Sequence, residues 1–211
     1  MINAEQLRSM MLYVAEKIVE SEEFLTDIDI KIGDGDHGIG MSLGFRGVLK
    51  ELPKAELAGA ESVFSETGMI LLDTMGGASG VLFGTMFISG VVRREARPAI
   101  GAADFAEIFR KSLDAIKQRG KARVGDKTMI DALEPAVVAL EGAADEGLPL
   151  PAALALAAKS AEAGVEYTKQ CVAKFGRAKY FKDASIGLQD PGATSVWIIW
   201  RSMAEWAREN L

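Results

Sequence analysis

Residues 3–20 read NAEQLRSMMLYVAEKIVE, and the apolar side chains in this stretch recur every three or four positions. Such spacing predicts an amphipathic α-helix, because side chains three and four residues apart lie on one face. Asn3 and Gln6 have the spacing of a capping box, which marks the start of the helix. The apolar face of this helix would consist of Leu7, Met10, Met11, Val14 and Ile18.

The same period recurs along the rest of the chain. Phe, Ile and Ser side chains follow helical spacing through residues 105–116. Asp126 is a candidate cap for a helix that carries the apolar positions of residues 129–140. The alanine-rich segment from 151 to about 174 has high helix propensity. A last helix is expected to begin with Asp190 as its cap and proline at the first helical position.

No segment alternates apolar and polar residues as an edge strand does, and no repeat or low-complexity linker divides the chain. We therefore expect a single all-α domain over residues 1–211, built as a bundle of amphipathic helices. Functional residues are expected in the loops between the helices, where the unusual residues lie. The expected loops are residues 27–40, 96–102, 119–126, 145–150 and 176–190.

The composition argues against several classes of protein. With 24 Lys and Arg against 30 Asp and Glu, the net charge is −6, which disfavours nonspecific nucleic-acid binding. The single cysteine, Cys171, allows no internal disulfide, and the N-terminus lacks the pattern of a signal peptide. We therefore expect a cytoplasmic protein, with Cys171 in the core rather than in catalysis.

The segment Thr74–Val92 has the length and the lack of charge of a membrane span. It also contains five glycines, two serines and two threonines, which would make a poor lipid-facing surface. A buried helix is therefore expected here, and no association with a membrane.

Four aspartates lie within residues 27–36, where Gly33 and Gly35 interrupt them. Carboxylates packed this closely repel one another unless a cation neutralises them. Oxygen ligands on a flexible glycine-containing loop suit Mg²⁺ or Ca²⁺. The segment does not match an EF-hand, since a loop that began at Asp34 would have Phe45 in place of the twelfth-position glutamate. The sequence therefore predicts a hard-metal site, although a polar turn that only caps the next helix is the alternative.

His37, the only histidine, follows this acidic cluster directly. A lone histidine is more often a hydrogen-bonded structural residue than a catalyst. Zinc is disfavoured, because no other soft ligand lies nearby.

Two further loops have the composition of phosphate sites. Gly76–Gly80 would expose backbone N–H groups at a helix N-terminus, although small residues also allow close helix packing. Arg177 lies in a glycine-flanked loop and could bind a phosphate bidentately, although a solvated surface charge is the commoner case. An acidic metal loop, a glycine loop and a basic loop together are the parts of a magnesium–nucleotide site.

With these residues in view, the chain resembles the L subunits of dihydroxyacetone kinases, a family that includes the C-terminal domain of the single-chain ATP-dependent enzymes. The matching blocks run in family order over essentially the whole chain. They are residues 33–38, 76–80, 119–122, 125–129, 176–178 and 189–195.

The resemblance implies an antiparallel barrel of eight amphipathic helices, with the nucleotide among the loops at one end. It implies that Asp29, Asp34 and Asp36 coordinate two Mg²⁺ ions that bridge the phosphates of ADP or ATP, whereas Asp27 is not a ligand. No residue is implied as a general acid or base. The implied nucleotide-binding residues are His37, Gly38, Ile39, Gly40, Ala78, Ser79, Gly120, Met129, Arg177, Asp190, Pro191 and Gly192.

The resemblance also implies a function. Tightly held ADP would receive a phosphoryl group from an M-type protein of the phosphotransferase system and pass it to dihydroxyacetone held on a K subunit. Two alternatives are a kinase subunit that exchanges ATP and serves another small ketose, and a nucleotide-binding regulatory subunit without turnover of its own. A homodimer is left open.

Overall fold

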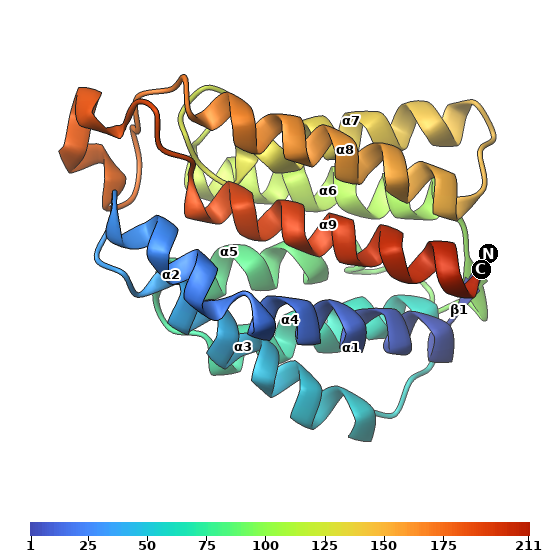
Figure 1. Cartoon of the computed structure of the whole chain (residues 1–211). Coiled ribbons are helices and arrows are strands. Elements are labelled where there is room, and N and C mark those ends of the chain that lie inside the picture. Colours follow the sequence, from blue (N-terminus) through green and yellow to red (C-terminus); the bar gives the residue numbers. More distant parts are fainter.

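A computed structural model describes residues 1–211 and contains nine α-helices, two short 3-10 helices and two strands of two residues each. The helices lie roughly along one direction (Figure 1). Their bounds are α1 (Ala4–Glu20), α2 (Glu22–Ile30), α3 (His37–Glu51), α4 (Ala60–Thr74), α5 (Gly77–Ile88), α6 (Ala102–Gly120), α7 (Ile130–Asp145), α8 (Leu150–Thr168) and α9 (Pro191–Asn210). The 3-10 helices are η1 (Leu52–Lys54) and η2 (Ala178–Ser185), and the strands are β1 (Ile2–Asn3) and β2 (Ala99–Ile100).

The predicted starts of the first and last helices are confirmed. The amide of Gln6 donates to Asn3 Oδ1 at 2.9 Å, and the amide of Asn3 donates to Gln6 Oε1 at 3.1 Å, so the capping box is complete. At α9 the carboxylate of Asp190 accepts a hydrogen bond from the amide of Ala193 at 2.7 Å. Both caps satisfy amides that a helix leaves without intrahelical partners.

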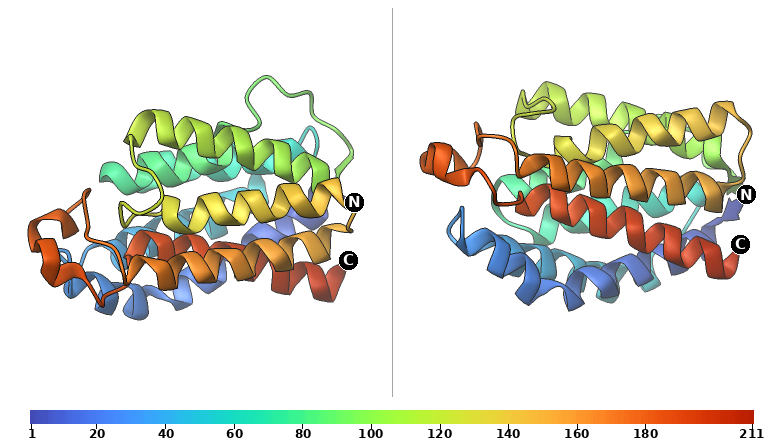
Figure 2. Two further views of the ribbon diagram at one scale, coloured as in Figure 1. Left: turned by 90° about the horizontal axis from the view of Figure 1, so that it is seen from above. Right: turned by 45° about the horizontal axis from the view of Figure 1, so that its top comes forward.

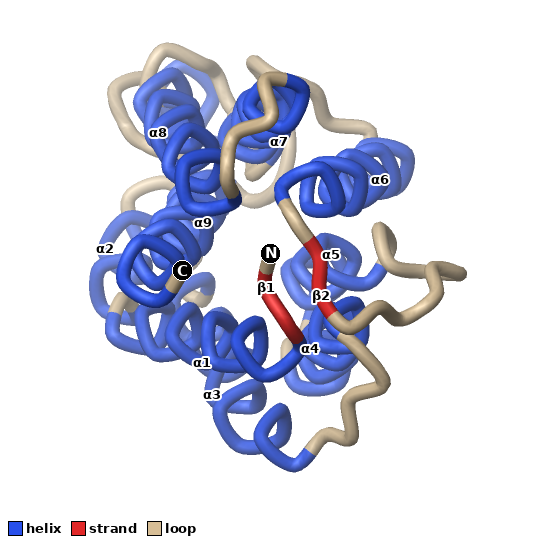
Figure 3. The backbone as a smooth tube through the Cα atoms, turned by 90° about the vertical axis from the view of Figure 1, so that its right-hand side faces the viewer, coloured by secondary structure: helices blue, strands red, loops and turns tan.

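The helices surround a common core, as the end-on view in Figure 3 shows. Helices that follow one another along the chain mostly pack side by side, and α1 closes the ring against α9. The all-α bundle predicted from periodicity and the barrel implied by the resemblance are therefore confirmed, with nine α-helices where the resemblance implied eight. Both termini lie at one end of the barrel, and the loop between α2 and α3 lies at the other (Figures 1 and 2).

Aromatic rings fill the centre of the barrel. The ring of Phe109 lies 4.7 Å from that of Trp200, and Phe64 makes edge contacts with Phe105 and Phe109 at 5.4 Å and 5.5 Å. These rings belong to one continuous apolar cluster that includes the predicted stripe of α1. Close packing of this kind holds the helix ends, and with them the loops, in fixed places.

The uncharged segment Thr74–Val92 forms α5 and its flanking turns, and Phe83, Met86 and Phe87 of this helix are buried. The prediction of a buried helix is therefore confirmed. No helix of the protein has both the length and the apolar character that a bilayer crossing requires.

Four details differ from the expectations. Residues 27–30 and 37–40 are helical, so the acidic loop shrinks to residues 31–36. The alanine-rich helix ends at Thr168 rather than near 174. A two-stranded antiparallel pairing joins β1 to β2 where no strand was expected, because two paired residues leave no alternating pattern. Eight residues of the loop 176–190 form η2.

A further correction concerns the start of α7. Asp126 does not cap this helix, since its carboxylate accepts from the amide of Arg123 and pairs with Lys174. Asp131, in the first turn, receives the hydrogen bonds instead, from the amides of Gly125 and Thr128 at 2.6 Å and 2.7 Å. The two aspartates lie five residues apart, and periodicity alone does not separate their roles.

Candidate nucleotide and metal site

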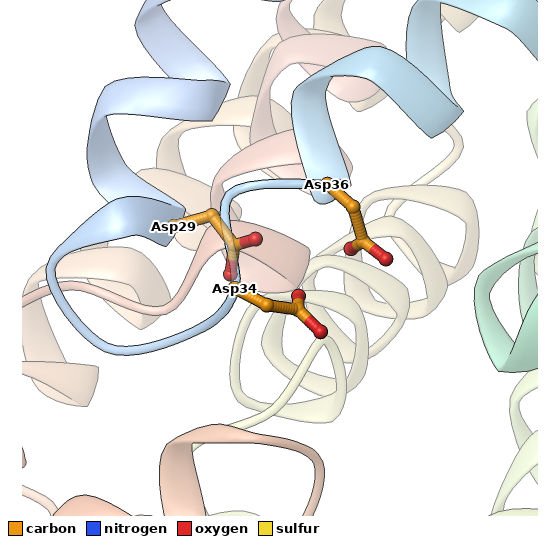
Figure 4. Close-up of side chains that lie close together, drawn as sticks. All are labelled: Asp29, Asp34 and Asp36. Atoms are coloured by element: carbon orange, nitrogen blue, oxygen red, sulfur yellow. The ribbon is translucent and has the colours of Figure 1, made fainter.

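Three aspartates converge at the end of the barrel that lies away from the termini. Asp29 belongs to the last turn of α2, whereas Asp34 and Asp36 lie on the loop that leads into α3. Each offers one carboxylate oxygen to a group of atoms that lie within 4.8 Å of one another (Figure 4). Asp29 is buried, and the other two are exposed. Asp27 is exposed on α2 and does not belong to the group.

The backbone of the loop fixes the orientation of Asp29. Its Oδ2 accepts hydrogen bonds from the amides of Gly35 at 2.9 Å and His37 at 3.2 Å. Gly33 passes so close to this carboxylate that a β-carbon would overlap Asp29 Oδ1. Gly35 has a φ of +80°, a conformation that favours glycine. The two glycines therefore allow the loop to wrap tightly around the acid.

The electrostatics of this cluster favour a cation. Partial desolvation raises the pKa of Asp36, although the residue is exposed, and repulsion from Asp34 and Asp29 raises it further. One cation is already in contact, because Arg177 Nε lies 2.8 Å from Asp34 Oδ2. Three carboxylates without a soft ligand match the donor set that Mg²⁺ prefers. The residues present therefore fit magnesium.

His37 is a structural rather than an acid–base residue at neutral pH. Burial lowers the pKa of His37 to about 4, despite the nearby charge of Asp29. Its Nε2 lies 2.8 Å from Ser195 Oγ, so the neutral ring joins the first turn of α3 to that of α9. This geometry agrees with the expectation that the lone histidine is a hydrogen-bonded residue.

Four helices begin around the aspartate loop, namely α3, α5, α7 and α9, and the first turn of each contributes to one cavity. Helix N-termini carry unpaired N–H groups and a partial positive charge, so they favour anions. At α5, a β-carbon on Gly76 or Gly77 would meet no atom within 4 Å, which leaves the backbone open to close approach. The arrangement therefore places metal-type ligands opposite a phosphate-type surface.

The cavity has a volume of about 1030 Å³ and gathers nearly all the residues that the sequence proposed. Gly38 is the exception, since it is buried against Glu22 and Thr26 of α2 instead of lining the cavity. The predicted residues that do line it are Asp29, Asp34, Asp36, His37, Ile39, Gly40, Ala78, Ser79, Gly120, Met129, Arg177, Asp190, Pro191 and Gly192.

Comparison with known proteins agrees with this geometry. The model of the DAK2 domain matches residues 31–205, which is most of the chain. The chain belongs to the DAK2 domain family.

Several relatives of this DAK2 domain are known. It is 41% identical to the PEP-dependent dihydroxyacetone kinase, ADP-binding subunit DhaL, of Escherichia coli (strain K12), over 89% of each chain. It is 34% identical to the PTS-dependent dihydroxyacetone kinase, ADP-binding subunit DhaL, of Lactococcus lactis, over 90% of this chain and 91% of that protein. It is also 33% identical to the triokinase/FMN cyclase of Rattus norvegicus, covering 97% of this chain but 35% of that protein.

The fold has solved counterparts. The dihydroxyacetone kinase of C. freundii in its native form matches with a TM-score of 0.73 and 27% identity. The match covers 94% of this chain and 34% of that chain, so the DAK2 domain corresponds to about a third of that enzyme. The same enzyme in complex with AMP-PNP and Mg²⁺ matches with a TM-score of 0.71.

Sequence reasoning missed one wall of the cavity in the DAK2 domain. The apolar residues of this part of the lining lie at ordinary helical and loop positions, so no motif marks them; they include Val81, Leu82, Phe83, Ile116, Ile130 and Phe175. Lys127 and Thr128 also line the cavity. Both lie in a block whose pattern indicates only a helix cap, and the sequence gives no sign that Lys127 is buried.

Proposed function

We propose that this DAK2 domain is the ADP- and magnesium-binding subunit of a dihydroxyacetone kinase. In this role, bound ADP accepts a phosphoryl group from an M-type protein of the phosphotransferase system, and dihydroxyacetone on a K subunit receives it. The partners are therefore a K-type and an M-type protein, in the cytoplasm.

One observation carries the proposal. The carboxylates of Asp29, Asp34 and Asp36 converge within 4.8 Å, and the cavity they line is also lined by the first turns of four helices. A nucleoside diphosphate is held best where cations neutralise its phosphates from one side and N–H groups donate to them from the other. Relatives of similar length, such as the Escherichia coli protein, are named as ADP-binding subunits of dihydroxyacetone kinases.

Three parts of the chain would hold the metal ions, the phosphates and the base. Asp29, Asp34 and Asp36 would hold two Mg²⁺ ions, which offset the charge of the phosphates during transfer. The open backbone at Gly76 and Gly77 would donate to phosphate oxygens. The apolar wall has room for the base, and no side chain is needed as a general base, because positioning and electrostatics dominate phosphoryl transfer.

Arg177 would have two alternative partners. In the structure it pairs with Asp34 at 2.8 Å, and its side chain remains 73% exposed. A metal ion on Asp34 would compete for the same carboxylate, which would leave the guanidinium available for a phosphate. Arg177 would then help to hold the nucleotide only when the metal is bound.

The relay is tested by nucleotide retention and by a reconstituted reaction. Protein purified without added nucleotide is analysed for bound ADP by denaturation and mass spectrometry. Formation of dihydroxyacetone phosphate is then measured with a K-type partner and a phosphorylated M-type protein. We expect retained ADP and turnover that requires the phosphorylated M-type protein.

An ATP-dependent kinase subunit is the second candidate, because the dihydroxyacetone kinase of C. freundii, which has the same fold, is known in complex with the ATP analogue AMP-PNP and Mg²⁺. The same reaction with ATP in place of the M-type protein separates the two. Rapid loss of ADP during gel filtration, together with full turnover on ATP alone, would reject the relay and support exchange. Replacing dihydroxyacetone with other small ketoses then identifies the substrate.

A further inference from the structure

Lys127 is a lysine in an unusual position. It lies in the loop between α6 and α7, and its side chain is only 1% exposed. Its backbone has a φ of +59°, which is costly for a residue with a β-carbon. A buried charge and a strained backbone at one residue indicate that the surrounding structure holds it for a reason other than stability.

The ammonium group of Lys127 connects three segments that are distant in the sequence. Its Nζ donates to the carbonyl oxygen of Thr168, the last residue of α8, at 2.6 Å, and also to that of Leu188. Leu188 lies two residues before Asp190, the cap of α9. Lys127 therefore ties the start of α7 to the end of α8 and to the segment that leads into α9.

Thr168 reinforces the same connection. Its hydroxyl accepts from the amide of Asp190 at 3.0 Å and donates to the carbonyl of Val165 at 2.6 Å. The segment 188–190 is thus held on one side by Lys127 and on the other by Thr168. Asp190, Pro191 and Gly192, which follow, line the cavity.

The charge of Lys127 has partners beyond the two carbonyl groups. Burial lowers its pKa, whereas the fields of Asp190, Cys171 and Asp131 act in the opposite direction. Asp131 and Asp190 are both buried; Asp131 lies in the first turn of α7, and Asp190 caps α9. The ammonium group is therefore stabilised by acids at the starts of two of the helices that begin at the cavity.

We propose that Lys127 is a positioning residue for a nucleoside diphosphate: its ammonium group fixes residues 188–192, and so sets where Asp190 and the first turn of α9 meet the ligand. The inference rests on the proposed nucleotide-binding function. Lys127 borders the cavity, but its buried ammonium group donates to the carbonyl groups of Thr168 and Leu188, so it acts through this segment, and the residues that it positions make the contact.

The test compares the affinity for Mg-ADP with the stability of the fold in the full-length protein. After removal of co-purified nucleotide with EDTA and gel filtration, titration calorimetry gives the dissociation constant for Mg-ADP. Urea unfolding followed by circular dichroism gives the stability. We expect Lys127→Met to raise the dissociation constant by about tenfold or more, as for the loss of a charged hydrogen-bond donor.

Two controls separate positioning from loss of stability. Val137→Ala truncates a buried core residue of α7 that does not line the cavity, so it lowers stability without touching the segment 188–192. Lys174→Met removes the ion pair with Asp126, the residue that precedes Lys127 in the loop between α6 and α7. Both are expected to change the dissociation constant by less than about threefold.

A third variant, Thr168→Val, removes the hydrogen bond to the amide of Asp190 with little change in volume. Like Lys127→Met, Thr168→Val is expected to weaken Mg-ADP binding. If Lys127→Met is insoluble, Lys127→Gln, which retains an N–H donor but no charge, is measured against the same controls.

The outcomes separate the two proposals. If the wild-type protein binds Mg-ADP and the Lys127 variant binds it within about twofold, the positioning role is rejected and the proposed function stands. Equal losses in Val137→Ala and Lys127→Met would also reject it, since affinity would then follow stability alone. A wild-type protein that does not bind Mg-ADP would overturn the proposed function, and this inference with it.

Discussion

Asp34 and Asp36 project from a short loop toward Asp29, whose carboxylate two backbone amides hold in place. Proximity of this kind raises the pKa of Asp36, because partial desolvation and its two acidic neighbours oppose its negative charge. A divalent cation removes this repulsion, so binding of the metal and of the nucleotide should depend on each carboxylate.

We expect Asp34→Asn and Asp36→Asn each to weaken magnesium-dependent ADP binding by more than about 100-fold, since even outer-shell partners of a metal account for about 10–100-fold. Titration calorimetry with and without EDTA measures the effect, and circular dichroism should show unchanged helicity. Asp27→Asn, on the exposed side of α2, is the matched control and should bind as the wild type does. ADP retained by both loop variants would contradict the metal assignment.

The single histidine permits a direct pH test. The folded-state pKa of His37, about 4, is below its usual value of 6.5 because the ring is buried. Between these two values the unfolded chain binds the additional proton, so the contribution of His37 to stability should rise with pH from about 4 to 6.5 and then level off. The gain is about 3 kcal/mol, at about 1.4 kcal/mol per pKa unit.

Proton NMR of the untagged protein follows the ring of His37 alone, because the chain has no other histidine. We expect a midpoint near pH 4, or no titration before acid unfolding. In His37→Gln the rise in stability over this range should be smaller. A midpoint near 6.5 would show that the ring is solvated, and it would remove the proposed link between α3 and α9.

The metal loop could be inferred from the sequence, because several carboxylates and glycines in one short segment are typical of a loop that binds a cation. Most of the nucleotide-binding residues could be inferred only from the resemblance to dihydroxyacetone kinase L subunits. Lys127 could be inferred from neither. Its neighbours in the fold, Thr168 and Leu188, lie 41 and 61 residues away in the chain, and a lysine in a loop is usually solvated. Only tertiary structure brings such partners together.

Among the helices and loops, a network of ion pairs around the buried Glu61 connects elements at the end of the barrel far from the cavity. Glu61, in the first turn of α4, is 3% exposed and accepts hydrogen bonds from the amide and from Nε of Arg97, each at 2.8 Å. Arg97 Nη2 also contacts Asp104 of α6 at 2.6 Å. The loop between α5 and α6 is thereby tied to two helices.

Removal of this carboxylate should destabilise the fold without affecting the site. We expect Glu61→Ala to lower the free energy of unfolding by about 1–3 kcal/mol, because it removes the buried carboxylate that accepts hydrogen bonds from the amide and the guanidinium of Arg97. Urea unfolding measures this loss, and the affinity for Mg-ADP at about 10–20 °C should be unchanged within about twofold. A loss of affinity as large as that in the aspartate variants would show that the two ends of the barrel are coupled.

The starts of α1 and α9 were predicted better than the end of α8. The side chains of Asn3 and Asp190 cap the first turns of α1 and α9, so the sequence marks where these helices begin. Thr168 ends α8 within a helix-favouring sequence, where tertiary contacts to Lys127 and Asp190 decide the boundary. Propensity could not give that end, because it describes the isolated segment only.

Over the whole molecule, charge is distributed unevenly. The chain carries a net charge of −6, yet Lys121, Arg123 and Lys182 are exposed on the two loops beside the cavity and have no carboxylate partner. Unpaired cations around a cavity raise the local concentration of an anionic ligand and speed its association.

We expect the association rate of a fluorescent ADP analogue with magnesium to fall as salt increases, by roughly tenfold between low and high ionic strength. Replacement of Lys121, Arg123 and Lys182 together by glutamine should reduce the rate at low salt and flatten this dependence. The dissociation rate should change little, because none of the three lines the cavity. Stopped-flow fluorescence measures both rates, and an association rate independent of salt would contradict the prediction.

The proposed function requires that this barrel bind a nucleotide through divalent ions on its aspartate loop. Anomalous diffraction from crystals grown with ADP and Mn²⁺, in place of Mg²⁺, shows directly where such ions lie. We expect manganese peaks at coordination distance from Asp29, Asp34 and Asp36, with the phosphates on the side of α5. Nucleotide bound elsewhere, or bound in the cavity with no metal on these three carboxylates, would contradict the assignment.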